Sequence, residues 1–216
     1  MRIKNKNTIY MILLILSLSL VGLVGCNKEE VKNEDVESAN EDNANFDSAS
    51  FKGTHQVEIE LENYGTIRVE LDEASAPITV NNFVKLVEEG FYDGLTFHRI
   101  ISGFMMQGGD PTGTGMGGSD ETIKGEFAQN GVENKLSHTR GAISMARSND
   151  VNSARSQFFI VHEDSTFLDG SYAAFGYVTE GMDVVDKICT ETPVQDKNGT
   201  VENEDQPVIK SIKVIK

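Results

Sequence analysis

Cysteine and histidine are scarce in this sequence, and their scarcity excludes the folds and sites that depend on them. The 216 residues include two cysteines, Cys26 and Cys189, and four histidines. The cysteines lie far apart and the histidines show no metal-ligand spacing, so we expect neither a disulfide framework nor a metal or other cofactor. We interpret Cys189 as a small buried apolar residue, and His98 and His138 as hydrogen-bonded structural residues.

Basic residues are also few. The chain has 19 Lys and Arg against 34 Asp and Glu, for a net charge of -15. Removing the three positive charges of residues 1–25 leaves -18 on the rest. This balance argues against nucleic acid as a partner and against electrostatic attraction to anionic lipid.

Signatures of nucleophilic and nucleotide-dependent enzymes are missing. Neither Ser144 nor Ser156 lies in a nucleophile-elbow motif, and no pair of carboxylates stands out. Gly113, Gly115 and Gly118 match the spacing of a dinucleotide-binding motif, but no βαβ unit surrounds them. We therefore interpret this glycine-rich segment as a flexible loop.

The N-terminus has the pattern of an export signal. Three basic residues precede an uncharged, Ile- and Leu-rich run from Asn7 to Asn27. Within it, Leu23-Val24-Gly25-Cys26 resembles a bacterial lipobox, whose cysteine is lipidated and becomes the mature N-terminus. We predict a signal peptide over residues 1–25, a lipid on Cys26 and a location on the outer face of the cell membrane. An uncleaved transmembrane anchor and an accidental cysteine are the alternatives.

A polar segment separates this signal from the folded domain. Residues 27–52 are rich in Asn, Glu, Asp and Ser, with too few apolar residues to offset the entropy of ordering. We predict a lipidated cysteine and disordered acidic tether over 26–52; an acidic recognition segment is the alternative. The remaining residues, 53–216, are enough to bury one core.

Apolar periodicity predicts a fold dominated by short strands. Apolar and charged residues alternate on both sides of Asn63-Tyr64-Gly65, which predicts a β-hairpin. Helical spacing after Pro77 predicts a helix that ends near Gly90. Further strands are predicted at Thr96–Ile101, Phe104–Gly108, Ala142–Ala146, Gln157–His162, Ala174–Val178 and Val208–Ile215, with a second helix at Met182–Cys189. Pattern alone leaves a closed barrel and a sandwich about equally favoured.

Four blocks of sequence resemble a known family. They are Thr-Phe-His-Arg-Ile-Ile-Ser-Gly-Phe-Met-Met-Gln-Gly-Gly-Asp at 96–110, Gly-Ala-Ile-Ser-Met-Ala at 141–146, Ser-Gln-Phe-Phe-Ile at 156–160 and Phe-Leu-Asp-Gly at 167–170. In order and spacing they resemble the cyclophilin family of peptidyl-prolyl cis-trans isomerases, over roughly His55 to Lys216. The resemblance implies a mainly β fold, a closed eight-stranded antiparallel β-barrel capped by two α-helices, and isomerase activity.

This activity needs no nucleophile. Rotation about an X-Pro bond crosses a barrier of about 18 to 20 kcal/mol that arises from amide resonance. In the twisted state the proline nitrogen is pyramidal and basic, so a donor aimed at it stabilises that state selectively. The resemblance assigns this role to Arg99. Gln107 shares a strand face with Met105 and can hold Arg99 or the substrate backbone.

The resemblance also implies an apolar socket for the proline ring. Its residues are Phe104, Met105, Phe159 and Leu168, with Ala146, Arg147, Gln157, Phe167 and Tyr172 also contacting substrate. The contact of Arg147 would be through its backbone, and Phe167 and Tyr172 replace a tryptophan and a histidine of many eukaryotic members. Phe158 and Phe159 are adjacent in a strand and must face opposite ways. Taken singly, these apolar residues could be core, and Arg99 a structural salt-bridge residue.

We therefore expect an isomerase that accelerates X-Pro isomerisation during folding of exported proteins. A non-catalytic prolyl-peptide-binding or chaperone module is the alternative, which would not need Arg99. A solute-binding lipoprotein lacks support in length and pattern. The expected partners are proline-containing polypeptides and the membrane, and we expect a monomer.

Overall fold

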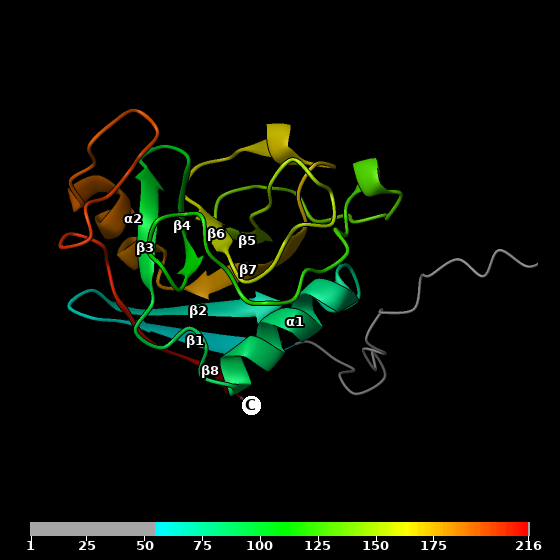
Figure 1. Ribbon diagram of the computed structural model, residues 1–216, viewed down its shortest axis with the longest axis horizontal. Coiled ribbons are helices and arrows are strands. Elements are labelled where there is room, and N and C mark those ends of the chain that lie inside the picture. Colours follow the sequence, from blue (N-terminus) through cyan, green and yellow to red (C-terminus); the bar gives the residue numbers. More distant parts are fainter. Residues whose placement is uncertain (1–54, 216) are drawn as a thin grey trace, which may run out of the picture. The chain divides into compact units, whose positions relative to one another are not determined.

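Eight strands and two α-helices make up the computed structural model, which describes residues 55–215 (Figure 1). The strands are β1 His55–Leu61, β2 Gly65–Leu71, β3 Thr96–Ile101, β4 Met105–Asp110, β5 Ala142–Met145, β6 Phe158–Val161, β7 Ala174–Glu180 and β8 Ile209–Ile215. The helices are α1 Pro77–Glu88 and α2 Met182–Glu191, and two 3-10 turns are η1 Ala128–Asn130 and η2 Thr166–Leu168. Every predicted strand and helix is present, with ends that differ by at most two residues. The predicted signal peptide, Cys26 and the tether lie outside the described residues.

The strands form one antiparallel sheet in the order β3-β4-β6-β5-β7-β2-β1-β8. The prediction of a closed barrel is wrong, because the sheet is an open half-barrel with β3 and β8 at its ends. These ends meet at an isolated bridge between Thr96 and Val208, just before β8 begins. Farther along β3, the loop before β8 takes the edge instead: Ile100 N–H donates to the Gly199 carbonyl at 2.8 Å. The loop thus protects an edge that a barrel would remove by closure.

Helix α1 begins where the sequence predicts. Pro77 occupies its first turn, where a missing N–H costs nothing. No side chain at Ala76 caps the helix; instead the buried carboxylate of Glu126 accepts hydrogen bonds from the N–H groups of Ile78 (3.0 Å) and Thr79 (2.8 Å). This contact ties the loop after β4 to the helix.

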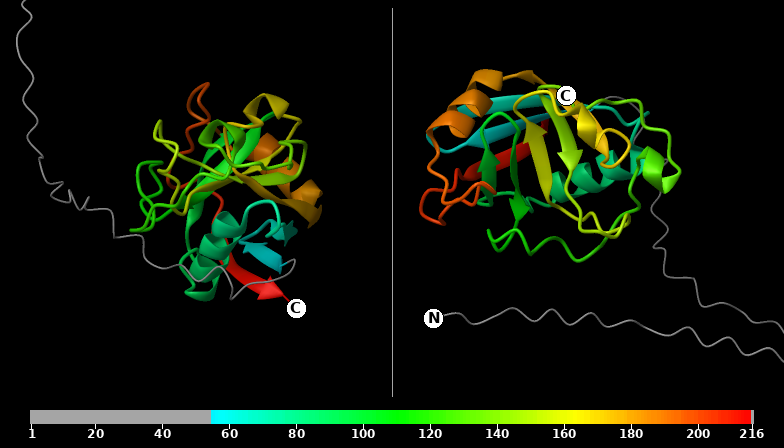
Figure 2. Two further views of the ribbon diagram at one scale, coloured as in Figure 1. Left: turned by 90° about the vertical axis from the view of Figure 1, so that its right-hand side faces the viewer. Right: turned by 90° about the horizontal axis from the view of Figure 1, so that it is seen from above.

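The two helices lie at opposite ends of the domain, α2 beside β2 and α1 beside β8 (Figures 1 and 2). Neither helix of the described residues is long and apolar enough to cross a membrane. Cys189 in α2 is buried, which confirms the prediction, and burial raises the pKa of its thiol to about 12. The thiol therefore stays protonated at neutral pH.

Apolar residues form two separate cores because neighbouring strand residues point to opposite faces. The larger core includes Met106 and Phe158, with Phe83 of α1 edge-on to Phe158 at 5.4 Å. The smaller core contains Met105 and Phe159, with Ala142, Val161 and Leu168. The prediction that Phe158 and Phe159 face opposite ways is confirmed. The smaller core forms the floor of the candidate site.

Candidate active site

A cavity of about 230 Å³ lies over the smaller core. Its lining consists of Arg99, Phe104, Met105, Gln107, Ala146, Arg147, Phe159, Leu168 and Tyr172. All nine belong to the eleven substrate and catalytic residues that the sequence predicts. Strands β3, β4 and β6 carry four of them, and the cavity brings together side chains up to 73 positions apart in the sequence, from Arg99 to Tyr172.

The floor of this cavity is apolar and nearly closed to solvent. Met105 and Phe159 are 1% and 5% exposed, and Leu168 is 9% exposed. The Phe159 ring meets Tyr172 edge-on, with ring centres 6.0 Å apart. An apolar ring such as that of proline gains free energy by leaving water for this surface.

Arg99 lies at the rim of the cavity and is held from two sides. Its Nε donates to the Asn198 carbonyl at 2.8 Å, and its Nη1 donates to Gln107 Oε1 at 3.2 Å. The Nη2 group has no hydrogen-bond partner among residues 55–215, so its donors are available to a ligand. Burial lowers the pKa of Arg99, and the charges of Tyr172 and Asp196 oppose this shift. The usual value is so high that the guanidinium remains charged at neutral pH.

A chain of amide hydrogen bonds leads away from Arg99. Gln107 Nε2 donates to Gln157 Oε1 at 2.8 Å. Gln157 Nε2 in turn donates to the carbonyls of Gly115 (3.0 Å) and Gly117 (2.8 Å). With Arg99 donating to Gln107, each amide oxygen accepts and each amide nitrogen donates. The orientation of both side-chain amides is thereby fixed.

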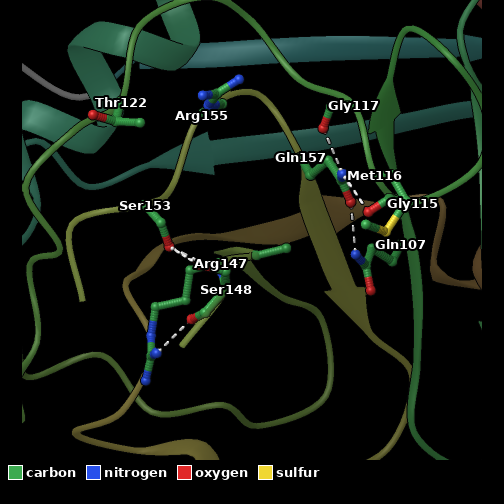
Figure 3. Close-up of a pocket in the computed structure, with 11 residues that line it drawn as sticks. Gln107, Gly115, Met116, Gly117, Thr122, Arg147, Ser148, Ser153, Arg155 and Gln157 are labelled. Atoms are coloured by element: carbon green, nitrogen blue, oxygen red, sulfur yellow. Dashed lines mark hydrogen bonds between the residues drawn. The ribbon is translucent and has the colours of Figure 1, made fainter. Parts of the chain in front are cut away.

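This chain ends at a second, larger pocket of about 400 Å³ (Figure 3). Its lining consists of Gln107, Gly115, Met116, Gly117, Thr122, Ala146, Arg147, Ser148, Ser153, Arg155 and Gln157. Three of these residues, Gln107, Ala146 and Arg147, also line the first cavity. Gln157, predicted as a site residue, lies here.

Several residues in or beside the two pockets are not predicted from the sequence. Asn198 holds Arg99 from the loop before β8, and no motif marks it. Met116 and its neighbours belong to the glycine-rich segment, which the sequence predicts as a flexible loop. The available signal was the run of glycines directly after a strand, which allows the backbone to approach a ligand closely.

The glycine-rich segment folds around one carboxylate. Asp110, 1% exposed, accepts hydrogen bonds from the N–H groups of Thr112 (2.8 Å), Thr114 (3.1 Å), Gly115 (2.6 Å) and Gly117 (3.2 Å). Burial acts to raise the pKa of Asp110, but these donors outweigh it and hold the pKa below its usual value. Four backbone N–H groups of the loop are thus held by one buried carboxylate, and the flexibility of the loop stays a prediction.

The side chain of Arg147 is held against the segment that contains Ser171 and Tyr172. Its Nε and Nη2 donate to the Ser171 carbonyl at 3.0 and 2.8 Å, and its guanidinium lies over the rings of Phe127 (5.0 Å) and Tyr172 (4.8 Å). The arginine therefore fixes the Ser171–Tyr172 wall of the site. Its backbone makes no hydrogen bond to other backbone groups of residues 55–215, which leaves it available for the substrate contact that the resemblance implies.

Phe167 lies outside both pockets. Its ring is 74% exposed and lies 5.6 Å from that of Phe104, at an interplanar angle of 33°. It extends the apolar surface beyond the cavity. Its direct contact with substrate stays a prediction.

His138 is hydrogen bonded, as predicted, in a serine-histidine-aspartate arrangement. Its Nδ1 lies 2.8 Å from Asp169 Oδ1 and its Nε2 lies 2.9 Å from Ser144 Oγ. Burial lowers the pKa of His138, which Asp169 opposes, so a neutral ring donates to the carboxylate and accepts from Ser144. Ser144 is fully buried, so no substrate carbonyl reaches it. The arrangement supports Phe159, whose ring stacks on His138 with centres 5.9 Å apart.

His98 differs from its prediction. It is 6% exposed, and neither ring nitrogen has a hydrogen-bond partner among the described residues. The expectation of a hydrogen-bonded residue is wrong here because His98 packs beneath Gly115, whose α-carbon carries no hydrogen-bonding group. Burial lowers its pKa, against the nearby charge of Asp110.

The architecture and both pockets can now be compared with known proteins. The sequence model of the family described as "Cyclophilin type peptidyl-prolyl cis-trans isomerase/CLD" matches residues 56–214. Peptidyl-prolyl cis-trans isomerase B of Bacillus subtilis is 50% identical over 123 residues, covering 57% of this chain and 82% of that protein. A peptidyl-prolyl cis-trans isomerase of Helicobacter pylori is 50% identical over 128 residues, covering 58% and 76%.

Solved structures agree with this assignment. A cyclophilin-type peptidyl-prolyl cis-trans isomerase of Cryptosporidium parvum, crystallised in the presence of the dipeptide Ala-Pro, is similar with a TM-score of 0.66 and 32% identity. The match covers 74% of this chain and 99% of that one. The chain therefore belongs to the cyclophilin-type peptidyl-prolyl cis-trans isomerases.

Proposed function

We propose that this isomerase lowers the X-Pro barrier by electrostatic stabilisation of the twisted imide, with Arg99 as the donor. One observation carries the proposal. The Arg99 guanidinium is held by Asn198 and Gln107 at the rim of an apolar cavity, and its Nη2 donors have no partner among residues 55–215.

The geometry favours the twisted state over the planar one. In the planar imide, resonance leaves the proline nitrogen without a basic lone pair. Twisting localises that lone pair, so a preorganised cation at the nitrogen gains more in the transition state than in the ground state. Because Arg99 is held before substrate arrives, little reorganisation is needed during rotation.

The other lining residues bind and position the substrate. The proline ring occupies the apolar floor formed by Met105, Phe159 and Leu168. Gln107 holds Arg99, and the backbone of Arg147 pairs with the residue before proline. The Cryptosporidium parvum structure was obtained in the presence of the dipeptide Ala-Pro, which supports proline-containing peptides as substrates.

Exchange spectroscopy on a prolyl peptide tests the role of Arg99. We expect Arg99→Ala to lower kcat/KM by on the order of 10² to 10³, as loss of one preorganised donor does. Arg68→Ala is the control, because Arg68 is an exposed arginine that pairs with Glu58 and Glu180 on the sheet surface. Equal activity of Arg99→Ala and wild type would show that another group stabilises the twisted state.

The same experiment addresses the non-catalytic alternative. A pure binding module would bind the peptide without accelerating exchange, and Arg99→Ala would then change neither property strongly. The proposed mechanism expects a large loss of exchange rate with a smaller change in peptide affinity, because the donor acts mainly in the transition state.

We propose that the clients are exported proteins and that the enzyme acts outside the cytoplasmic membrane. The support is the basic, then apolar N-terminus followed by Leu23-Val24-Gly25-Cys26. Two acyl chains on Cys26 would give stable anchoring. Mass spectrometry of the mature protein from a bacterial host should find a lipid-modified Cys26 at the N-terminus. An intact Met1, or an unmodified Cys26, would contradict the anchor and leave the isomerase mechanism in place.

A further inference from the structure

The second pocket carries positive charge in a strongly acidic protein. Arg147 and Arg155 are its only charged lining residues, and neither Asp nor Glu lines it. The whole chain has a net charge of -15. The local and overall charges are therefore opposite, which points to a ligand group that this site attracts and the rest of the surface repels.

Arg155 is the one arginine of residues 55–215 whose guanidinium has no hydrogen bond or ion pair there. The other four are engaged: Arg68 with Glu58 and Glu180, Arg99 with Gln107 and Asn198, Arg140 with Asp186 and His162, and Arg147 with Ser148 and Ser171. Figure 3 shows the Arg147 side chain extending away from Arg155. Arg155 alone offers all five of its donors to a ligand.

The stem of Arg155 is held in place. Its methylene groups lie against Gly118, where an added Cβ would come within 3.0 Å of Arg155 Cδ and 3.2 Å of its Cβ. Packing of the stem leaves the charged head exposed, as is common for long basic side chains. A guanidinium with a packed stem loses less conformational entropy on binding than a free one.

The lining of the second pocket also includes three hydroxyl groups, those of Ser148, Ser153 and Thr122. Ser148 Oγ donates to Ser153 Oγ at 2.8 Å, and Ser153 Oγ donates to the Asp150 carbonyl, so both serine protons are already engaged. Thr122 supplies a further hydroxyl, which makes no hydrogen bond within residues 55–215 (Figure 3). A planar guanidinium pairs with a carboxylate through two parallel hydrogen bonds, and the Thr122 hydroxyl is a further donor in the same pocket.

A substrate in the proline cavity can reach this pocket. The two cavities share Gln107, Ala146 and Arg147, so they are adjacent. In an extended peptide, every second side chain lies on the same face, about 6.6 Å farther along. A side chain within a few residues of proline therefore faces the second pocket.

We propose that Arg155 makes this isomerase select substrates with an Asp or Glu side chain within three residues of the proline. This inference rests on the isomerase activity of the first cavity and concerns its substrate preference. The preference opposes the net charge of the protein, which would by itself favour basic peptides.

A peptide scan with the full-length chain tests the inference. In an alanine-rich host peptide with one Ala-Pro bond, Glu, Gln or Lys is placed in turn at each of three positions on either side. Exchange spectroscopy gives kcat/KM for each peptide. At one position, we expect the Glu peptide to exceed the Gln peptide by roughly two- to fivefold, the range of an exposed ion pair, and the Lys peptide to be the poorest.

Charge variants assign the preference to Arg155. The Glu-to-Gln ratio should fall to about one in Arg155→Gln and below one in Arg155→Glu, and remain partly in Arg155→Lys. Arg68→Gln is the matched control, because it removes the same charge from a distant, exposed arginine; its ratio should equal that of wild type. Thermal unfolding confirms that each variant is folded. Binding of the Glu peptide should also shift the Arg155 Nε–H signal in NMR spectra.

The outcomes separate this inference from the activity on which it rests. No acceleration of any peptide would contradict isomerase activity. Acceleration with equal rates for Glu and Gln at all positions would overturn the inference alone. A Glu preference that persists in Arg155→Gln, or that disappears equally in Arg68→Gln, would show that the preference does not come from Arg155.

Discussion

The two adjacent pockets are built from different parts of the fold. The proline cavity rests on the smaller core, where Met105 and Phe159 are nearly inaccessible to solvent. The second pocket is bounded mainly by loops, with Met116 90% exposed and Arg155 exposed. In the proposed mechanism, catalysis therefore uses side chains that also stabilise the domain, whereas the proposed substrate preference uses exposed side chains that contribute little to stability.

Truncating one residue in each pocket gives the largest expected difference, because only the proline cavity is part of a core that stabilises the domain. Phe159→Ala removes a buried ring from the smaller core, and we expect the free energy of unfolding to fall by about 3 to 5 kcal/mol. Met116→Ala removes an exposed side chain and should change it by less than about 0.5 kcal/mol. Urea unfolding followed by circular dichroism measures both. Similar costs for the two variants would contradict the division.

The amide chain between the pockets should give an intermediate effect. Gln157→Leu keeps the approximate size but removes the acceptor for Gln107 Nε2 and the donor to Gly115 and Gly117. Loss of one such bond typically costs about 1 kcal/mol, and unpaired partners cost more. We expect kcat/KM to fall by about tenfold for all prolyl peptides, because Gln107 then holds Arg99 less firmly.

Gln56→Leu provides the control for this change. Gln56 is exposed on β1, far along the sheet from β4 and β6, and should retain wild-type kcat/KM. If Gln157→Leu also retained it, the amide chain would have no part in positioning Arg99. A loss confined to peptides with an acidic residue would instead place Gln157 in the preference pocket alone.

The contrast between the pockets also explains why the sequence predicted the residues of the proline cavity better than those of the second pocket. Phe158 and Phe159 were assigned to opposite faces because strand geometry requires it, and the apolar cavity follows from residues in regular strands. Asn198 and Arg155 lie in loops, where backbone course depends on tertiary contacts that no local pattern encodes. The resemblance supplied the number of strands and the residues of the cavity, but not that the sheet stays open between its end strands, β3 and β8. The sheet stays open because the loop at Gly199, and not β8, pairs with β3 at Ile100.

The smallest expected effect is a dependence of the free energy of unfolding on pH, through a histidine beside the second pocket. His98 is buried beneath Gly115, and burial lowers its pKa. The unfolded pKa of histidine is about 6.5. A histidine whose pKa is lower in the folded state stabilises the fold fully above this unfolded pKa. That contribution is lost as the pH falls from about 6.5 through the folded pKa. His138, with a pKa also lowered by burial, adds to the same trend.

His98→Leu should make the free energy of unfolding less dependent on pH between pH 7 and 5, because it removes one of these two contributions. A leucine of similar volume also removes two buried nitrogens that lack partners in residues 55–215, so the variant should be at least as stable as wild type at pH 7. In NMR spectra of wild type, the amides of Gly115 and Met116 should shift over this pH range, and in the variant they should not. If instead the shifts fell on Phe159 and its neighbours in the smaller core, the titration would belong to His138 and pH would act on the proline cavity.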